Sequence, residues 1–161
     1  MSGLTKLELH ERLLLAVGVT RGWVTEVPLV LNLRQIAVPL AVWAFTLTSP
    51  PGGRHPTESK IQLIVPGQDR RGRGNFSGPS GAFKLLVGVH PTEDLFVLWD
   101  CYLHRNFAYS KNVQVRAPVL WDATVAGIAI TTRHIDDGVE AIIAARGDHL
   151  VEAIKHRINI Q

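Results

Sequence analysis

Apolar residues recur at helical spacing near both ends of the chain. Thr5 stands three residues before Glu8, a spacing typical of the capping box that begins a helix, and Gly18 is expected to end that helix. A second helix is predicted from residue 118 to about residue 133, and Asp148 is expected to cap a third. Each predicted helix carries an apolar stripe, so the helices are expected to pack on the core.

The middle of the chain has the alternation that predicts β-strands. The expected strands cover residues 38–48, 60–65, 83–89, 95–102, 112–116 and 139–145, the last of them at a sheet edge. Residues 38–48 are apolar on both alternating faces, which indicates a central strand. Residues 50–53 (Pro-Pro-Gly-Gly) are expected to end this strand. Residues 23–33 are expected to form a connection. This order predicts an α+β fold, with a twisted, mostly antiparallel, half-barrel-like sheet flanked by N- and C-terminal helices.

Composition narrows the class of protein. With 161 residues, of which 46% are hydrophobic and 19% charged, the chain is expected to form one domain, residues 1–161, around a buried core. Its longest apolar run, residues 36–47, is interrupted by Pro39 and is shorter than the roughly 18 residues that a membrane span needs. The N-terminus lacks a signal region, and the single cysteine, Cys101, excludes an internal disulfide. We therefore expect a cytoplasmic protein.

Positive charge is concentrated in two stretches of the chain. Residues 54–84 contain six basic and two acidic residues, and residues 101–116 contain three basic residues and no acidic one. These stretches carry +4 and +3, so the rest of the chain carries −4 against the net charge of +3. Such segregation is expected when one face of a protein meets a polyanion. Two solvated basic loops would give the same pattern, and that alternative stays open.

Residues 96–114 (FVLWDCYLHRNFAYSKNVQ) combine aromatic, amide and basic side chains in one segment. A nucleobase site needs rings for stacking, hydrogen-bonding groups for the base edge and cations for the phosphates. Strand alternation places Phe96 and Leu98 on one face, and Val97 and Trp99 on the other. Packing in the core is the simpler interpretation of Phe96 and Trp99, whereas residues 109–112 are equally consistent with a functional and a scaffolding role.

Motifs for other chemistries are incomplete. The seven histidines show no H-x-H or H-E-x-x-H spacing, so no metal site is expected. Gly72 and Gly74 lack the third glycine and the following helix of a dinucleotide loop, so no cofactor is expected. Glu58-Ser59-Lys60 matches half of a metal-dependent nuclease site, but no carboxylate stands between Glu26 and Glu58 to complete it.

Four stretches of the chain resemble one known family. They are residues 60–68 (KIQLIVPGQ), the Arg/Gly-rich loop after them, residues 96–100 (FVLWD) and residues 104–115 (HRNFAYSKNVQV). Together they are similar to the methylase-associated X1 domain, which is found beside DNA-modification genes or fused to nuclease domains that resemble mismatch endonucleases. The likeness covers roughly residues 34–157.

The resemblance implies a non-catalytic domain that binds duplex DNA carrying modified bases, in particular 5-methylcytosine. Such a domain would serve a modification-dependent (type IV) restriction system in defence against phage. Because the chain ends at Gln161 with no recognisable nuclease, we expect it to be the N-terminal part of a longer enzyme. The expected partners are methylated double-stranded DNA and a C-terminal nuclease domain, and a homodimer is one assembly that fits.

Charge pattern and resemblance together give candidate DNA contacts. Six basic residues are expected to bind the backbone: Lys60, Arg70, Arg71, Arg73, Arg105 and Lys111. Six residues are expected to bind the base: Trp99, Asp100, Phe107, Tyr109, Ser110 and Asn112. Trp99, Phe107 and Tyr109 would form an apolar wall, and Asp100 or Asn112 would accept from the cytosine amino group. A buried methyl contributes only about 0.8 kcal/mol, so phosphate contacts must supply most of the affinity.

Two other functions remain open at this point. The first is a metal-dependent nuclease that uses Glu58 and Lys60 with Asp94 or Asp100 in an uncommon order. The second is a module that binds RNA or another protein through its strands. Cleavage of DNA in the presence of magnesium or manganese would distinguish the first from a DNA-binding domain, and competition between RNA and duplex DNA would distinguish the second.

Overall fold

The computed structural model describes residues 3–20, 24–49, 58–136 and 138–161. Its α-helices are α1 (Lys6–Val17), α2 (Ala117–Ala126) and α3 (Leu150–Asn159). Its strands are β1 (Leu29–Leu31), β2 (Leu40–Thr46), β3 (Glu58–Leu63), β4 (Phe83–Val89), β5 (Leu95–Trp99), β6 (Lys111–Arg116), β7 (Ile128–Ile135) and β8 (Gly138–Arg146). Two 3-10 helices, η1 (Cys101–Leu103) and η2 (Gly147–His149), complete the description. None of the helices in these ranges combines the length and the apolar character needed to cross a bilayer.

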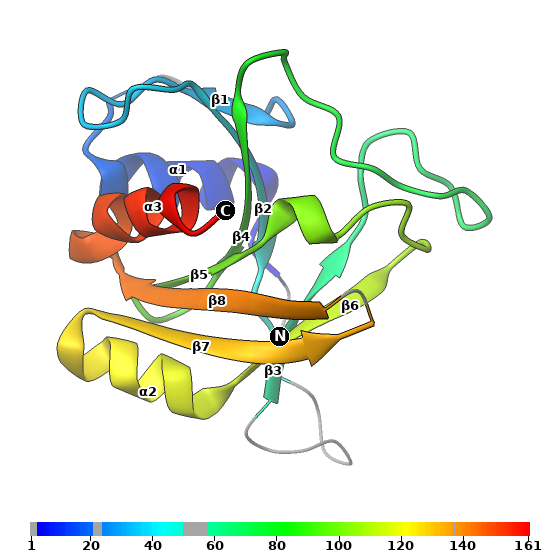
Figure 1. Ribbon diagram of the computed structural model, residues 1–161. Coiled ribbons are helices and arrows are strands. Elements are labelled where there is room, and N and C mark those ends of the chain that lie inside the picture. The colour runs from blue at the N-terminus through cyan, green and yellow to red at the C-terminus, as the bar shows by residue number, and fades with distance from the viewer. Residues whose placement is uncertain (1–2, 21–23, 50–57, 137) are drawn as a thin grey trace.

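A six-stranded sheet, in the order β1-β2-β4-β5-β8-β7, forms the centre of the molecule (Figure 1). Every neighbouring pair is antiparallel except β2 and β4, which are parallel. Helices α1 and α3 lie side by side on one face, and α2 lies against the opposite face. The predicted α+β class, the mostly antiparallel sheet and the flanking N- and C-terminal helices are therefore confirmed, and the sheet is open, not closed into a barrel.

The central sheet is apolar on both faces, in agreement with the two-sided apolar strand predicted at residues 38–48. Leu40, Val42 and Ala44 of β2 pack with α1 and α3, whereas Ala41 and Trp43 point into the second core on the other face. Strand β5 divides in the same way, because Phe96 and Leu98 belong to the first core, and Val97 and Trp99 to the second. Burial of both faces explains why these strands are continuously hydrophobic.

Strands β3 and β6 form a separate antiparallel ribbon over the second core. Ile61 and Leu63 of β3 and Val113 and Val115 of β6 are buried beneath the ribbon. The alternate residues of both strands point outward and are polar. The ribbon is tied to the end of β2 by the paired backbones of Thr48 and Lys60, at 2.8 and 2.9 Å. The main sheet thus carries a polar two-stranded surface on the face opposite to α1 and α3.

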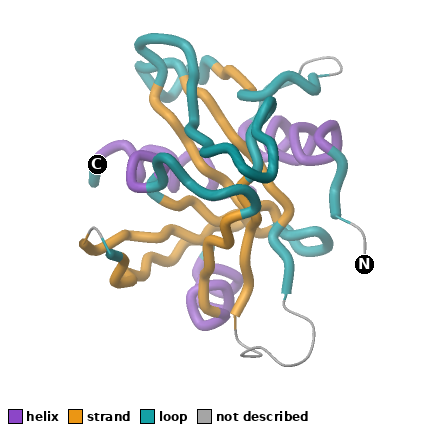
Figure 2. The backbone as a smooth tube through the Cα atoms, turned by 90° about the vertical axis from the view of Figure 1, so that its right-hand side faces the viewer, coloured by secondary structure: helices purple, strands orange, loops and turns teal. Residues whose placement is uncertain are grey.

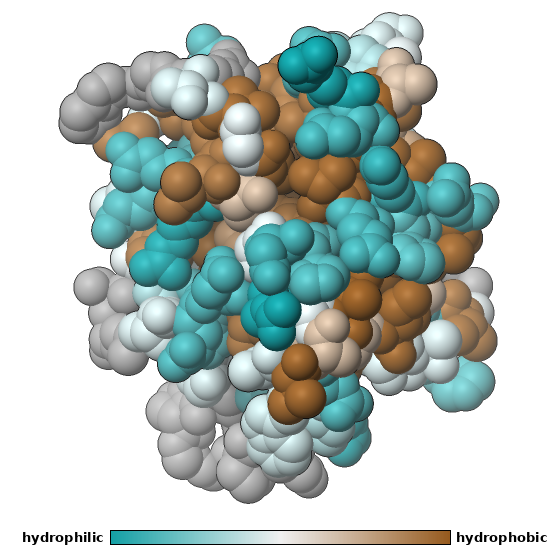
Figure 3. All heavy atoms as spheres, turned by 90° about the vertical axis from the view of Figure 1, so that its left-hand side faces the viewer, coloured by the Kyte–Doolittle hydropathy of each residue, from teal (hydrophilic) through white to brown (hydrophobic). Residues whose placement is uncertain are grey.

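Helix α1 begins and ends where the sequence predicts. The Thr5 hydroxyl accepts from the Glu8 backbone N–H at 3.2 Å, and the Glu8 carboxylate accepts from the Thr5 N–H at 2.9 Å. Gly18 adopts the left-handed conformation, with a φ of 76°, and ends the helix. Figure 3 shows the side of the molecule that is on the left in Figure 1, where hydrophilic and hydrophobic residues are interspersed.

The predicted helix from residue 118 to residue 133 is wrong in its second half. Helix α2 ends at Ala126, and β7 runs from Ile128 to Ile135. Gly127, with a φ of 93°, turns the chain between them, and a Cβ at this position would lie 2.4 Å from the His149 ring. The β-branched residues of ITTRHI favour a strand, and pairing with β8 overrides the helical spacing that continues from α2.

Three smaller predictions also need correction. Residues 139–145 belong to β8, which is an internal strand between β5 and β7 and not an edge strand. Within the expected connection at residues 23–33, Leu29–Leu31 form β1, which pairs with β2. Asp148 does not cap α3, which begins after His149; its carboxylate binds the Arg146 guanidinium instead. Trp23, residues 50–53, which were predicted to end the central strand, and Arg54 lie outside the described residues.

Candidate nucleic-acid interface

The two basic stretches of the sequence are hydrogen-bonded to each other. Gly74 and Phe107 exchange backbone hydrogen bonds of 2.8 and 2.9 Å, and the Asn75 side chain accepts from the Asn106 N–H at 2.8 Å. The Gln68 amide group also donates to the Phe107 carbonyl, at 3.3 Å. Residues 68–75, here the basic loop, therefore lie against residues 104–110, here the aromatic turn. Figure 2 shows loops gathered on this side of the molecule.

The predicted backbone-binding residues are carried by these neighbouring segments. Arg70, Arg71 and Arg73 are exposed on the basic loop, Arg105 is exposed on the aromatic turn, and Lys111 is exposed at the start of β6. The turn is joined to the ribbon because the Ser110 N–H donates to the Leu63 carbonyl at 3.1 Å. The sixth predicted residue, Lys60, lies on the outer face of the ribbon and donates to Asn112 Oδ1 at 3.2 Å. The loop arginines, Arg105 and Lys111 are thus brought to one end of the ribbon, whereas Lys60 lies further along it, opposite Gln114.

Two aromatic residues beneath the basic loop anchor it to the core. The Phe107 ring lies 5.0 Å from the Phe76 ring, which lies 5.1 Å from the Trp43 ring of β2. Both phenylalanines are buried. Phe107 therefore presents no ring face to a base; it fixes the position of the arginines above it. A fixed loop loses less conformational entropy on binding than a free one.

Trp99 and Asp100 are also committed to contacts inside the protein. Trp99 is fully buried, and its indole N–H donates to the Gln114 carbonyl of β6 at 3.0 Å. One Asp100 oxygen accepts from the Tyr102 N–H at 3.0 Å, and the other lies 3.9 Å from the Arg157 guanidinium. The Asp100 side chain is 13% exposed and Trp99 has no exposed surface, so the expected apolar wall does not include Trp99.

Tyr109, Ser110 and Asn112 remain accessible for contacts. Tyr109 and Ser110 are half-buried, and Asn112 is exposed on the ribbon. Ser110 has a φ of 61°, a conformation that non-glycine residues rarely adopt, and it turns the chain directly into β6. These three residues lie beside Lys111, at the same end of the ribbon as the basic loop.

The residues of the nuclease alternative are not brought together. Glu58 opens β3 opposite Arg116, whereas Asp94 lines a cavity formed by α1, the β4–β5 turn and η2. Asp100 is bonded as described above. Across the described ranges, no three His, Cys, Asp or Glu side chains lie where they could hold one metal ion. Burial raises the pKa of the Cys101 thiol to about 12, so this sulfur is not a nucleophile.

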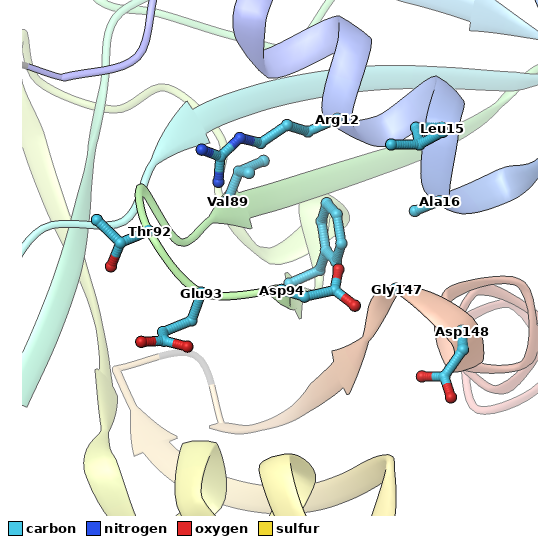
Figure 4. A pocket seen from close by; sticks show the side chains of 10 residues that line it. Arg12, Leu15, Ala16, Val89, Thr92, Glu93, Asp94, Gly147 and Asp148 are labelled. Atoms are coloured by element: carbon cyan, nitrogen blue, oxygen red, sulfur yellow. The ribbon is translucent and has the colours of Figure 1, made fainter.

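The cavity that Asp94 lines has a volume of about 530 Å³ (Figure 4). Arg12 of α1 reaches across it and donates to the carbonyls of His90 and Pro91, both at 2.7 Å. Asp148 lies at its other end, where a hydrogen bond from Arg146 and one from His149 lower the pKa of the carboxyl to about 2. Arg12 is engaged with protein oxygens, and the carboxylates of Glu93, Asp94 and Asp148 also line the cavity, so it is a weaker candidate for an anionic ligand than the basic end of the ribbon.

A polar groove between β6 and β7 was not foreseen from the sequence. It consists of two cavities of about 360 and 290 Å³, and Arg133 and His134 line both. Arg133 donates to the Gln114 carbonyl at 2.9 Å, across the groove. Arg133 and His134 were missed because the helix predicted from residue 118 ended on Arg133. The alternation of residues 128–135 is the signal that could have placed both residues on a strand.

Substituting Gly74 is expected to uncouple the basic loop from the aromatic turn. A Cβ at this position would lie 2.4 Å from the Phe107 ring and 2.6 Å from the Gln68 side chain, so Gly74→Ala must displace one of them. Duplex affinity should fall about fivefold to tenfold, because the loop must then be ordered on binding. Fluorescence anisotropy would measure this, with Ser77→Ala, an exposed position nearby, as the control. Equal affinity of Gly74→Ala and the unsubstituted protein would show that the coupling does not matter.

Comparison with known proteins supports one family. The family model described as Methylase-associated X1 matches residues 38–154 of the chain. A comparison with curated proteins finds no match, and a comparison with solved structures finds none either. The matched region contains the ribbon, the basic loop, the aromatic turn and the β6–β7 groove, and it covers most of the chain. The chain therefore belongs to the methylase-associated X1 family.

Proposed function

We propose that this chain is a DNA-binding domain that recognises methylated duplex DNA. Membership of the methylase-associated X1 family connects the chain with methylation and restriction systems. The observation that carries the proposal is the hydrogen-bonded contact between the basic loop and the aromatic turn, which brings together Arg70, Arg71, Arg73, Arg105 and Lys111. Such a cluster fits the regular phosphates of a duplex.

Electrostatic attraction accounts for affinity but not for selectivity. Phosphate contacts position a protein on DNA, whereas contacts with base edges distinguish one sequence or modification from another. Tyr109, Ser110 and Asn112 are the accessible candidates for such contacts from the predicted set. A methyl group placed against an apolar surface adds about 0.8 kcal/mol, or roughly a fourfold preference. We therefore expect tight, salt-sensitive binding with a modest intrinsic preference for 5-methylcytosine.

The proposal is tested by titrating the protein into two duplexes that differ only in methylation of their cytosines. Both should bind at low salt, and the methylated duplex should bind about fourfold more tightly. An RNA duplex of the same sequence serves as the competitor. Equal affinity for both DNA duplexes would remove the methyl-reading part of the proposal. Preferential binding of the RNA would favour an RNA-binding module instead.

A further inference from the structure

The outer face of the ribbon carries two amides beside an exposed isoleucine. Leu63 points into the second core, so Gln62 and Ile64, on either side of it, point outward. Gln62 is exposed and lies opposite Asn112 of β6, which is also exposed. Ile64 is 40% exposed just beyond β3, where the bond from the Ser110 N–H to the Leu63 carbonyl continues the pairing. An apolar side chain and two amides therefore share one accessible surface at the basic end of the ribbon.

Lys60 determines which end of the Asn112 amide is left for a ligand. The Lys60 ammonium donates to Asn112 Oδ1 at 3.2 Å. An ammonium group only donates, so the amide atom that faces it must be the oxygen. The amino group of Asn112 then keeps two N–H donors, and neither is bonded to another described residue. The surface therefore offers hydrogen donors beside the Ile64 side chain, a combination that suits an acceptor next to an apolar group.

The ribbon is a ridge with a hollow along each of its long sides. A cavity of about 500 Å³ separates β3 from the chain after β2 and the β4–β5 turn, and Lys60 and Gln62 line it. The two cavities between β6 and β7 lie on the other side. The major groove of B-DNA is about 12 Å wide and admits a two-stranded ribbon. In an RNA duplex the major groove is too deep and narrow for side chains to read.

Three carboxylates lie near the ribbon, and each has a cation beside it. Asp69 accepts a backbone N–H of the basic loop at 3.0 Å, and the three arginines of that loop outnumber it. Glu58 lies at the far end of the ribbon, opposite Arg116. Asp136 lines the smaller cavity beside the ribbon, together with Lys111. The basic end of the outer face therefore stays positive, as contact with a polyanion requires.

We infer that the outer face of the ribbon enters the major groove of an intact duplex, where Asn112 donates to guanine N7 and Ile64 packs against the methyl group of 5-methylcytosine. This inference rests on the proposed function and names the residues that determine its specificity. A C–G pair presents the guanine N7 and O6 acceptors in the major groove, and a methyl group on cytosine C5 projects into the same groove. Ile64 is diagonal to Asn112 across the two strands, about 7–8 Å away, so both reach the same or adjacent base pairs.

Replacing Ile64 with alanine is expected to abolish the methyl preference. Affinity for the methylated duplex should fall about fourfold, because the methyl group loses its apolar contact. Affinity for the unmethylated duplex should stay within about twofold. Ile160→Ala is the matched control, since Ile160 follows α3 and is 45% exposed, and it should keep the preference. Fluorescence anisotropy measures the four affinities, and thermal unfolding verifies that both variants are folded.

Modified bases test the groove and the Asn112 contact. Replacing the guanine paired with the methylated cytosine by 7-deazaguanine removes N7, and should weaken binding about fivefold to tenfold, the effect of one hydrogen bond. Asn112→Ala should bind the natural duplex more weakly by the same factor and lose nothing further with 7-deazaguanine. Inosine at this position lacks only the amino group in the minor groove, so affinity should stay within about twofold. Loss of affinity with inosine but not with 7-deazaguanine would place the protein in the minor groove and overturn the inference.

Failure of this inference is distinguishable from failure of the proposed function. If methylated duplex is preferred but Ile64→Ala keeps the preference, the Ile64 contact is wrong and methyl recognition stands. If 7-deazaguanine is tolerated while duplex still binds, the Asn112 contact is wrong and DNA binding stands. If no duplex binds even at low salt, the proposed function fails and the inference fails with it.

Discussion

Replacing Arg70, Arg71 and Arg73 together with glutamine is expected to weaken duplex binding by about two orders of magnitude at 0.15 M salt. Each phosphate contact releases about 0.9 counterion, which contributes a factor of about five at this salt concentration. The slope of log K against log salt should become shallower by about three, one for each lost contact. Methylated and unmethylated duplexes should lose affinity alike, because these arginines contact no base in our account.

The control for this variant removes positive charge elsewhere on the surface, two cations in place of three. Arg34→Gln combined with Lys155→Gln removes two exposed cations, one between β1 and β2 and one on α3. This double variant should lower affinity less than about threefold, since neither residue belongs to the basic loop, the aromatic turn or the ribbon. If it weakened binding as much as any two of the loop arginines, net charge alone would explain affinity, and a localised binding surface would be excluded.

Replacing Trp99 with alanine is expected to have the largest effect on stability, about 3–5 kcal/mol in the free energy of unfolding. The ring is fully buried in the second core, and its N–H joins β5 to β6 through the Gln114 carbonyl. Trp99→Phe keeps most of the buried ring but loses this hydrogen bond, and should cost about 1–2 kcal/mol. The Gln114 carbonyl keeps its hydrogen bond from Arg133 in both variants. Urea unfolding monitored by circular dichroism measures these values.

The matched control is Trp121→Ala on α2. This tryptophan is 60% exposed, so its removal should change the free energy of unfolding by less than about 0.5 kcal/mol. Folded Trp99→Phe should retain the methyl preference of the unsubstituted protein. Unchanged stability of Trp99→Phe together with a lost methyl preference would instead assign Trp99 to the base contact and contradict its place in the core.

The sequence predicts those elements whose pattern is local. The capping box of α1, the two-sided apolar strand at β2 and the β4–β5 hairpin follow from short-range signals, and the structure confirms each of them. The strand β7 was missed because residues 128–133 continue the helical spacing of α2, which hides the alternation of residues 128–135, and the long-range pairing with β8 decides between the two. Strand β8 is internal only because β7 pairs with it, so the prediction of an edge strand at residues 139–145 was wrong for the same reason.

The candidate site was predictable in its charges but not in its geometry. Counting basic residues identifies the loop arginines, yet the Gly74–Phe107 hydrogen bonds that join the two segments are long-range contacts. Aromatic residues were harder to interpret, since a ring that stacks on a base and a ring that fills a core have the same composition. Phe107 fills the core, and so does Trp99.

The most direct test of the account is the salt dependence of duplex binding by the unsubstituted protein. Six basic contacts predict a slope of log K against log salt of about −5, measured by fluorescence anisotropy between 0.05 and 0.3 M salt at roughly constant pH. A slope near zero, or no binding even at 0.05 M salt, would contradict the claim that the basic loop, the aromatic turn and the ribbon form one surface for DNA.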